Sequence, residues 1–499
     1  MASQPEVYNL TMNRLRHLYR ASQVGEMDRL AIESFGIPGY ELMCRAGEAA
    51  FRRLRARWPE ASGLTIFCGA GNNGGDGYVI ARLAQDVGLS VQVISLKSPL
   101  SLSGDAARAA ADWLDRGEVS GDIDQPVLGD VIVDALLGTG LDRAPEGVWA
   151  QAIERINCAD RPVVAIDLPS GLAADTGMPL GVCVKADLTV SFIGNKRGLW
   201  TGQAGRWCGD RHFDALETPD ELIERIPPDA RLLIDDDLRQ AFSSRPADTH
   251  KGQLGHVLVV GGDLGMAGAV LLAGRAALAS GSGLVSLATR PEHAVMAPVF
   301  QPELMAHGVT AAEQLQSLTD RASVLALGPG LGQSDWSKTL WNTAVASEVP
   351  MVIDADGLNL LAGWSGASGP WVLTPHPGEA ARLLDCSTVE IQRDRFAAAR
   401  KLAARFGAVV VLKGHGSLIA TPDGRMAVCG HGSPAMATAG MGDALTGIIA
   451  SLLGQGMGFF EAACQGVLLH AVAGDRAAQG RRQILASDLI AQLPEVMPS

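Results

Sequence analysis

The sequence predicts an α/β protein made of two successive units, each with a parallel β-sheet between helices. Three observations lead to this fold class. At 499 residues the chain suits two large domains. It combines 59 glycines with only 5% aromatic residues, as α/β sheets with many tight turns at strand ends do. Near-continuous apolar segments alternate with helical ones, which indicates sheets covered on both faces.

The composition restricts the classes of function. Hydrophobic residues make up 47% and charged residues 19%, as expected of a globular chain with sizeable cores. The net charge of −13 argues against general binding to nucleic acid or to an anionic membrane surface. The N-terminus lacks the apolar core of a signal peptide, and no apolar stretch reaches the roughly 20 residues that span a bilayer. The eight cysteines form no C-x-x-C pair, which favours reduced thiols and a cytoplasmic location over zinc or disulfides.

The first 60 residues are expected to be mainly helical. Val24, Met27, Leu30 and Ala31 recur at helical spacing and share one face. The pattern then changes to short apolar segments that predict strands: LTIFC, VQVISL, VIVDALLG and VVAIDLPSG.

A second series of predicted strands begins near residue 256. It comprises HVLVVGG, GLVSLAT, SVLALGPG, MVIDADG, WVLTPHPG, AVVVLKG and GSLIATP. The segment 217–252 between the two series is rich in charge and proline, as domain linkers often are. We therefore predict two domains, residues 1–228 and 229–499.

A glycine-rich loop joins the first predicted strand of the N-terminal domain to a helix. Its sequence, GAGNNGGDG, matches G-x-G-x-x-G, a spacing that lets backbone amides approach a phosphate at a helix N-terminus. A plain turn would explain the glycines but does not require the polar residues Asn72, Asn73 and Asp76. The next predicted strand ends in Lys97 and not in an acid, which argues against ordinary dinucleotide binding.

Two further strands of this domain end in carboxylates. Asp134 and Asp167 each follow a run of buried-type residues, and ligand sites lie beyond the carboxyl ends of parallel strands. Helix capping is the alternative explanation for either residue alone. Asn73, Asp134 and Ser170 offer hard oxygen ligands, which suit an alkali cation better than a soft metal.

Four motifs together resemble the NAD(P)H-hydrate epimerase family over most of residues 10–215. They are GAGNNGGDGYVIARLA, DALLGTGL, AIDLPSGL and ADLTVSFIGNKRGL. The resemblance implies a Rossmann-like three-layer αβα sandwich, a potassium ion held by Asn73, Asp134 and Ser170, and Asp167 as the acid–base residue at the reacting carbon. The hydrate-binding residues that it implies are Asn72, Asn73, Gly74, Gly75, Asp76, Gly138, Thr139, Gly140, Leu141, Asp142 and Asp167.

The strongest signal of the C-terminal domain is GSPAMATAGMGDALTGIIASLLG. Gly440 to Gly442 make a tight loop before a predicted helix, so the loop presents free amides at the positive end of a helix dipole. The apolar stripe that predicts the helix consists of Leu445, Ile448, Ile449, Leu452 and Leu453. Asp443 lies in the first turn. Capping would explain it, but the flanking glycines favour a base that takes a hydroxyl proton as a phosphoryl group arrives.

Other loops of this domain carry polar groups beyond strand ends. A strand is expected to end at Leu412, and the turn Lys413–Ser417 offers a cation and amides to a nucleotide phosphate or ribose, although basic β-turns are common. His376 lies between two prolines and could contact a substrate, whereas a lone histidine is more often packed or solvated. The loops GGDLGMAGA, LGPGLG and DADGLN follow further strands.

These motifs together resemble the ADP/ATP-dependent NAD(P)H-hydrate dehydratase family over about residues 230–495, with HKGQLGHVLVVGG and ATAGMGDALTG as the specific segments. The resemblance implies a ribokinase-like αβα fold. It implies hydrate contacts from Ala269, Gly330, His376 and Asp443. It implies contacts with the adenine nucleotide from Lys413, Gly414, His415, Gly416, Ser417 and Gly442. Asp263 stands where a small hydroxyl residue is expected.

The two resemblances predict a bifunctional repair enzyme, both isomerase and lyase. The first domain would interconvert the R and S epimers of NAD(P)H hydrate, and the second would dehydrate the S form at the expense of ADP, or of ATP, with Mg²⁺ on the phosphates and Asp443 as base. A ribokinase-like vitamin kinase with a non-catalytic N-terminal binding module is the alternative. The partners expected are these small molecules, with no nucleic acid or membrane, and further copies of the chain in a symmetric homo-oligomer.

Overall fold

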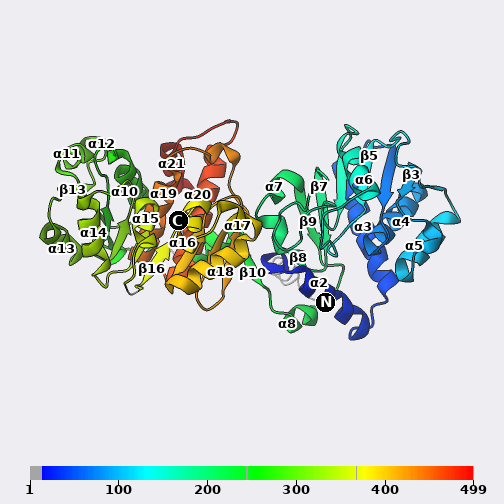
Figure 1. Cartoon of the computed structure of the whole chain (residues 1–499), viewed down its shortest axis with the longest axis horizontal. Coiled ribbons are helices and arrows are strands. Elements are labelled where there is room, and N and C mark those ends of the chain that lie inside the picture. The colour runs from blue at the N-terminus through cyan, green and yellow to red at the C-terminus, as the bar shows by residue number, and fades with distance from the viewer. Residues whose placement is uncertain (1–13, 243–244, 367, 498–499) are drawn as a thin grey trace. The chain divides into compact units, whose positions relative to one another are not determined.

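A computed structural model of the chain describes residues 14–242, 245–366 and 368–497 (Figure 1). The chain divides into two compact units, Met1–Arg231 and Leu232–Ser499. Both units are α/β structures with parallel sheets, which confirms the predicted fold class. The domain limits 1–228 and 229–499 stay a prediction, since the division falls a few residues later, inside strand β10 (Ala230–Leu233).

The first unit contains the following elements in chain order: β1 (His17–Tyr19), α2 (Ala21–Glu33), α3 (Gly39–Arg57), β2 (Gly63–Cys68), α4 (Asn72–Asp86), β3 (Ser90–Ser95), η1 (Pro99–Ser101), α5 (Gly104–Leu114), β4 (Val119–Ser120), β5 (Val131–Ala135), α6 (Val148–Asn157), β6 (Val163–Ile166), β7 (Leu188–Phe192), β8 (Asn195–Lys196), η2 (Arg197–Trp200), α7 (Ala204–Trp207), β9 (Asp210–Asp214) and α8 (Glu221–Arg225).

A parallel sheet of order β4-β3-β2-β5-β6-β7-β9 forms the centre of this unit. The order reverses between β2 and β5, as in the Rossmann fold, and ligands bind such sheets at the reversal, beyond the carboxyl ends of the strands. The register places Phe67 of β2 beside Asp134 of β5, and Asp134 beside Ala165 of β6. The strand was predicted to end in Asp134, and β5 continues one residue further, to Ala135, so Asp134 lies inside the strand.

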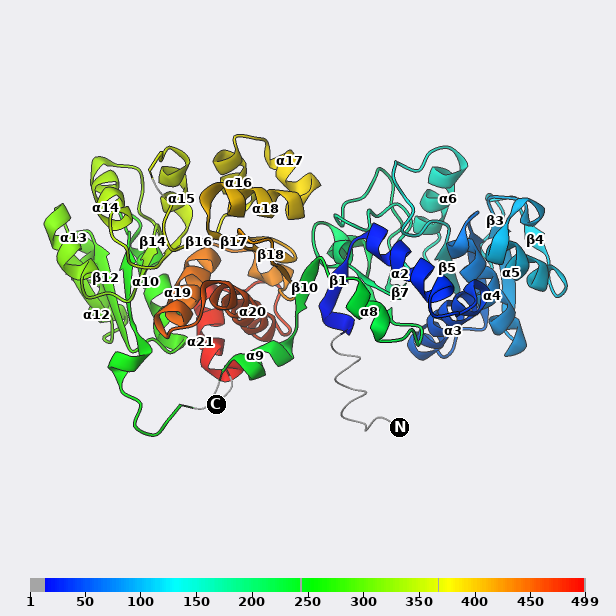
Figure 2. The same ribbon diagram turned by 90° about the horizontal axis from the view of Figure 1, so that it is seen from below.

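Helices cover both faces of this sheet, which makes three layers (Figure 2). Helices α3, α4 and α5 pack on one face, and α6 packs on the other through Ala152, Ile153 and Ile156. Of the predicted apolar face of α2, Val24, Met27 and Ala31 are buried. Near-continuous apolar strands are required here because both of their faces meet helices.

The second unit contains these elements in chain order: α9 (Asp235–Ala241), η3 (Lys251–Leu254), β11 (His256–Val260), α10 (Ala267–Ala279), β12 (Leu284–Thr289), α11 (Pro291–Ala294), α12 (Ala297–Phe300), β13 (Met305–Gly308), α13 (Ala312–Thr319), β14 (Val324–Leu327), α14 (Asp335–Val345), β15 (Met351–Ile353), α15 (Ala355–Ala362), β16 (Trp371–Leu373), α16 (Pro377–Leu384), α17 (Thr388–Arg393), α18 (Arg395–Phe406), β17 (Val409–Leu412), β18 (Ser417–Ala420), β19 (Met426–Cys429), η4 (Pro434–Met436), α19 (Met441–Gly454), α20 (Phe459–Ala477) and α21 (Ala486–Val496).

The strands of the second unit follow the order β13-β12-β11-β14-β15-β16-β17-β18-β19. Neighbours from β13 to β17 are parallel, and β17, β18 and β19 are antiparallel. Helices α10, α19, α20 and α21 pack on one face and α14, α15, α16 and α18 on the other (Figure 2). The strands β9 and β13 lie outside the predicted segments, because a partly exposed strand at a sheet edge has no continuous apolar run.

Helix α19 begins as predicted, with Asp443 in its first turn and Gly440 in a left-handed conformation at φ +88°. Among the described residues, no helix is both long and apolar enough to cross a membrane. All eight cysteines are free thiols.

Candidate active sites

A cavity of about 1020 Å³ lies at the carboxyl-end edge of the N-terminal sheet. Most of the predicted hydrate-binding residues line it, namely Asn72, Asn73, Asp76, Gly138, Thr139, Gly140, Leu141, Asp142 and Asp167. Gly74 and Gly75 pack behind its wall. A Cβ on Gly74 would lie 2.2 Å from the Gly69 carbonyl oxygen, and one on Gly75 would lie 2.5 Å from the Met43 side chain. These glycines let α4 start directly against the sheet.

Two of the three predicted potassium ligands share hydrogen bonds. The Ser170 hydroxyl donates to Asp134 Oδ1 at 2.6 Å, and the Ser170 amide donates to Oδ2 at 2.8 Å. Asn73 lies close by, since a Cβ on Gly138 would be 3.5 Å from its Oδ1. The Leu137 amide, one residue earlier, donates to Ser170 Oγ at 2.9 Å. The edge of the sheet thus collects carboxylate, hydroxyl and amide oxygens.

The carboxyl group of Asp134 is fully buried. Burial raises its pKa to about 6, although hydrogen bonds from Ser170 and the Leu136 amide act to lower it. A nearby cation would stabilise the charged form. No group of three or more His, Cys, Asp or Glu side chains in the described part of the chain could hold a metal ion. The predicted potassium set differs from such groups because it contains a single carboxylate.

Asp167 pairs with a lysine that the motifs did not single out. It follows β6 in a left-handed conformation at φ +66°, and the Lys196 ammonium group donates to its Oδ1. The same ammonium group donates to the Phe192 carbonyl at 2.8 Å, and the lysine side chain is 1% exposed. A buried lysine is rare unless paired. In the sequence, only its position inside the family motif FIGNKRGL marks Lys196 as a candidate site residue.

In the C-terminal unit, Asp443 lies beside an ion pair. The Lys413 ammonium group donates to Asp354 Oδ1 at 2.6 Å, and the Thr446 hydroxyl donates to Oδ2 at 2.9 Å. A Cβ on Gly442 would lie 3.3 Å from both Asp354 Oδ2 and Lys413 Nζ. The start of α19 therefore packs directly on the pair, and a larger residue at position 442 would intrude on it.

The charges of this cluster set the proton affinities. Burial acts to raise the pKa of Asp354, but the charge and hydrogen bond of Lys413 outweigh it and lower the pKa below its usual value. Burial and the Asp354 charge raise the pKa of Asp443 to about 7, against the opposing charge of Lys413. The negative charge of Asp356 also contributes to this rise of the Asp443 pKa. A carboxyl group that titrates near neutral pH suits general acid–base catalysis.

His376 caps helix α16. Its Nδ1 accepts from the Gly378 amide at 2.9 Å and from the Glu379 amide at 3.3 Å. Its Nε2 lies 3.4 Å from Glu379 Oε1, while Glu379 Oε2 lies 3.9 Å from Lys413 Nζ. Burial raises the pKa of Glu379 to about 7 and lowers that of His376. The predicted substrate residue His376 and the predicted nucleotide residue Lys413 thus lie at the same edge of the sheet.

Arg395 of α18 holds the turn that follows β17. Its guanidinium group donates to the carbonyl oxygens of Leu412 at 3.1 Å, Lys413 at 3.3 Å and Gly416 at 3.5 Å. A Cβ on Gly414, whose φ is +145°, would lie 2.9 Å from Arg395 Nη1. Because these carbonyl groups turn toward Arg395, the turn is held in one conformation, as a loop that presents amides to a phosphate must be.

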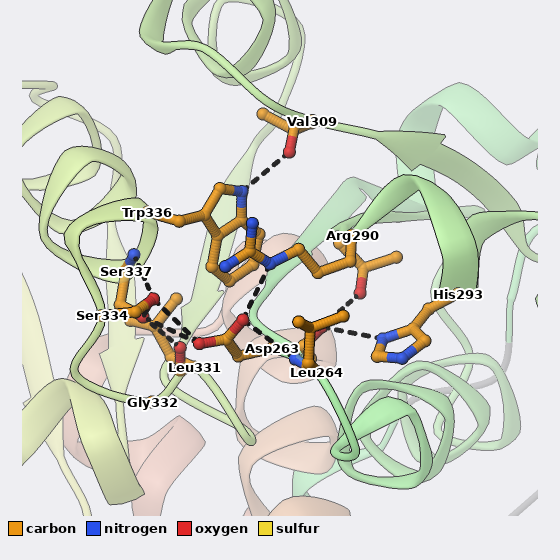
Figure 3. A network of polar contacts seen from close by, with 12 residues as sticks. Asp263, Leu264, Arg290, His293, Val309, Leu331, Gly332, Ser334, Trp336 and Ser337 are labelled. Carbon is orange, nitrogen blue, oxygen red and sulfur yellow. Dashed lines mark hydrogen bonds and ion pairs between the residues drawn. The ribbon is translucent and has the colours of Figure 1, made fainter.

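Asp263 connects three loops at the same edge (Figure 3). Its Oδ1 accepts from Arg290 Nε at 2.7 Å, and its Oδ2 accepts from the Ser334 hydroxyl at 2.9 Å. Arg290 stacks on the Trp336 ring at 4.3 Å. The Asp263 amide donates to the Gly330 carbonyl at 2.7 Å. At this position, where a small hydroxyl residue is expected, the aspartate joins the loops after β11, β12 and β14.

The predicted hydrate residues Ala269 and Gly330 are neighbours beside this network. A Cβ on Gly330, whose φ is +56°, would lie 3.1 Å from the Ala269 Cβ. A Cβ on Gly440, at the start of α19, would lie 2.5 Å from Leu272 of α10. Helix α10 therefore links these residues to the loop that precedes Asp443.

The motifs include Asp354, which lies in DADGLN, but they do not show its role. Glu379 directly follows the motif WVLTPHPG, and Arg290 directly follows GLVSLAT, so both lie just outside the motifs. Arg395 lies outside all of them. Its signal is an arginine among apolar residues on a helix that packs on the sheet, and only tertiary contacts show what it binds.

Comparisons with known proteins agree with the division into two units. Residues 39–198 match the family model for the YjeF-related protein N-terminus, and residues 257–495 match the NAD(P)H-hydrate dehydratase model. The bifunctional NAD(P)H-hydrate repair enzyme of Coxiella burnetii is 48% identical over 95% of this chain and 98% of its own length. The enzyme of the same description from Escherichia coli is 42% identical over 96% and 94%.

One solved structure adds the fold of the second unit. A ribokinase-like superfamily protein of Enterococcus faecalis is 28% identical, with a TM-score of 0.50, over 54% of this chain and 95% of its own. The likeness confirms the predicted ribokinase-like fold.

Proposed function

The chain belongs to the family of bifunctional NAD(P)H-hydrate repair enzymes, and we propose that each unit performs one of two repair reactions. The N-terminal domain interconverts the R and S epimers of NADH and NADPH hydrate. The C-terminal domain dehydrates the S epimer to NADH or NADPH and consumes an adenine nucleotide. The observation that supports this most strongly is the position of Asp443, which has a pKa raised to about 7 and lies at a helix N-terminus beside the Lys413–Asp354 pair.

The dehydratase chemistry solves a leaving-group problem. Hydroxide is a poor leaving group, whereas the phosphate of a phosphate ester is a good one. Asp443 takes the proton of the hydrate's hydroxyl group while the terminal phosphoryl group of the nucleotide transfers to that oxygen. The amides of Gly440 to Gly442, at the positive end of α19, stabilise the charge that develops. The lone pair of the ring nitrogen then expels the phosphate and forms a C=N bond, and loss of a proton from the neighbouring ring carbon restores the reduced nicotinamide.

The nucleotide is assigned to the turn held by Arg395. Lys413, Gly414, His415, Gly416, Ser417 and Gly442 would contact ADP, with ATP as the alternative. Mg²⁺ supplies charge neutralisation on the phosphates when it is bound. The nucleotide phosphates would supply most of its ligands, since magnesium typically binds substrate phosphates and keeps several waters. Ala269, Gly330, His376 and Asp443 would contact the hydrate.

The epimerase chemistry is assigned to the large N-terminal cavity. Its volume of about 1020 Å³ is large enough for a dinucleotide-sized substrate. Asp167, paired with Lys196, moves protons at the hydroxyl-bearing carbon. Asn73, Asp134 and Ser170 would hold potassium. The buried Asp134 carboxyl group and the side-chain oxygen of Asn73, near Gly138, fit an ion with oxygen ligands at this point.

We also propose that the enzyme acts in the cytoplasm as a homo-oligomer, in line with the family resemblance. The alternative, a vitamin kinase with a non-catalytic first domain, is less supported because the two full-length relatives carry the bifunctional description. It would form a phosphorylated product, whereas the dehydratase releases reduced nicotinamide.

The decisive experiment follows the absorbance of reduced nicotinamide during incubation of the purified chain with Mg²⁺, ADP and a mixed hydrate preparation. We expect recovery beyond the fraction present as the S epimer, since both reactions proceed. The Asp443→Asn variant should lose turnover and still bind ADP in calorimetry. Recovery by that variant at the wild-type rate would contradict the assignment of the base. No recovery with ADP or ATP would remove the dehydratase function.

A further inference from the structure

The N-terminal cavity contains more carboxyl groups than the proposed epimerase chemistry uses. Asp28, Asp76 and Asp167 all line it, together with Lys196. Asp167 is the one that pairs directly with the lysine. The other charged residues that line the cavity are Lys97, Asp105, Asp142, Arg143 and Glu146. Lys97 and Arg143 are exposed, so water screens their charges.

Asp28 enters the cavity from α2, the first helix of the unit that the structure describes in full. The helix buries Val24, Met27 and Ala31, and Asp28 lies four residues after Val24, on the same side. No hydrogen bond or ion pair to its carboxyl group occurs within the described part of the chain. The charged residues Glu26 and Glu33 of the same helix pair with Arg29 at the exposed surface.

The electrostatic environment of Asp28 and Asp76 favours their protonated forms. Burial raises the pKa of Asp28, and the negative charge of Asp167 raises it further, against the opposing charge of Lys196. Burial also raises the pKa of Asp76 well above its usual value, with the charges of Asp167 and Asp28 acting in the same direction. A single buried ammonium group does not neutralise three neighbouring carboxylates, so a proton is retained among them.

Asp76 is the less suitable of the two as a mobile proton donor. It is 8% exposed and lies in α4, just past the first turn of the helix. Asp28 is more accessible, and it comes from a different element than Asp167, which follows β6. An epimerisation needs one group to give a proton and another to take it, and two carboxyl groups in different environments divide these roles.

We propose that Asp28 is a second catalytic residue of the epimerase, the acid that protonates the leaving hydroxyl group of the hydrate. This inference rests on the proposed epimerase function. It assigns Asp28 the proton-donating role and leaves Asp167, which is paired with Lys196, to accept a proton from water.

Epimerisation proceeds by loss of water from the hydroxyl-bearing carbon and addition of water to its other face. The proton of Asp28 passes to the hydroxyl oxygen, and the C–O bond breaks with its electron pair leaving on the water that forms. The lone pair of the ring nitrogen forms a C=N bond to the same carbon. A water molecule then adds to the other face of that carbon, its electron pair closes the new C–O bond, and the C=N pair returns to nitrogen. The added water loses its extra proton to Asp167, and proton exchange with solvent then removes that proton from Asp167 and returns one to Asp28.

The test uses the full-length chain without nucleotide, so that only epimerisation proceeds. A single R epimer of NADH hydrate is incubated with wild type, D28N, D28E and D28A, and the epimers are separated by chromatography. We expect D28N to lose roughly 10²–10⁴-fold in kcat above the spontaneous rate while its KM changes little, because a general acid acts in the chemical step. D28E should retain part of the activity, and acetate should partly restore D28A.

The pH dependence and an isotope give independent results. The wild-type rate should fall as pH rises above the pKa of Asp28, because only the protonated form donates, and D28N should lack this limb. In ¹⁸O-labelled water the product epimer should carry ¹⁸O. Product that retains ¹⁶O would overturn the proposed step.

Matched controls separate this role from a structural one. E26Q makes the same chemical change on the exposed side of the same helix and should epimerise like wild type. Calorimetry should show that D28N still binds the hydrate, as an intact cavity requires. D28N with the wild-type rate and pH profile would overturn the role of Asp28. A wild-type chain that does not exceed spontaneous epimerisation would instead overturn the proposed epimerase function.

Discussion

The proton affinity of Asp443 depends on its neighbours more than on the aspartate itself. Burial withdraws water from its carboxylate, and the charges of Asp354 and Asp356 disfavour ionisation, while Lys413 opposes them. The result, a pKa of about 7, leaves the group able to take a proton at neutral pH and to release it afterwards. The same carboxyl group in water would be too weak a base.

This environment predicts the pH profile of dehydration. Because Asp443 acts in its ionised form, kcat/KM for the S epimer should fall as pH decreases below about 7. Replacing Asp356 by Asn removes a negative charge and should lower the pKa of Asp443. The fall of kcat/KM on the acidic side of the profile should then begin at a lower pH. Stopped-flow absorbance of reduced nicotinamide measures both profiles. If kcat/KM of the Asp356 variant falls by half at the same pH as that of the wild type, a group other than Asp443 controls the acidic side of the profile.

The buried pair Lys413–Asp354 predicts a large loss of stability. Asp354 is 1% exposed, so replacing it by Asn removes the partner of an ammonium group that has little access to water. We expect a destabilisation of about 3–5 kcal/mol in urea unfolding. Asp335→Asn breaks the exposed pair Lys338–Asp335 and should cost about 0–1 kcal/mol. Equal costs for the two variants would contradict the assigned burial of the pair.

The contact between α10 and α19 determines where the Asp443 loop lies. A Cβ on Gly447 would be 2.0 Å from the Ala273 carbonyl oxygen, so the two helices approach closely along glycine. Leu445, Ile448, Ile449 and Leu452 of the predicted stripe are buried, and Leu453 is partly exposed. The stripe therefore anchors the helix on the sheet, and its first turn is held at the sheet edge.

Gly447→Ala should separate these helices. The extra methyl group has no space, so we expect a loss of about 1–3 kcal/mol and a lower midpoint in thermal unfolding. Gly268→Ala in α10 is the matched control, because a Cβ there meets nothing within 4 Å. Alanine should be neutral or slightly stabilising at that position. A Gly447 variant as stable as wild type would mean that the two helices can move apart without cost.

Each unit has its own hydrophobic core. In the first unit apolar side chains of α3, α4 and α5 pack on the sheet, and in the second those of α10, α19 and α20 do. The candidate sites also lie within single units. Ligands of one site should therefore stabilise the unit that binds them, by an amount that grows with ligand concentration.

Calorimetry of the whole chain should show this separation as two unfolding transitions. Potassium should raise the midpoint temperature of one transition, and ADP with Mg²⁺ should raise that of the other. Each ligand should add about 2.7 kcal/mol to the free energy of unfolding of its unit when it is at 100 times its Kd. Asp134→Asn should remove the potassium effect and leave the ADP effect intact. A single transition that responds to both ligands would contradict independent units.

Local sequence patterns were sufficient for the fold class and for the loops that carry the chemistry. Glycine loops after apolar segments correctly placed Asp443 in a first helical turn and Lys413 after a strand, because strand length and helix periodicity are local properties. The family motifs of the first domain likewise contained most of the residues that line the N-terminal cavity.

Tertiary packing alone revealed the partners of these residues. Lys196 lies 29 residues from Asp167, Asp354 lies 59 residues from Lys413, and Asp263 lies 27 residues from Arg290. Such pairs form only when the carboxyl ends of separate parallel strands meet at one edge. Proton affinities depend on that burial and on those neighbouring charges, so the acid–base properties of the sites arise from the folded chain and not from any single motif.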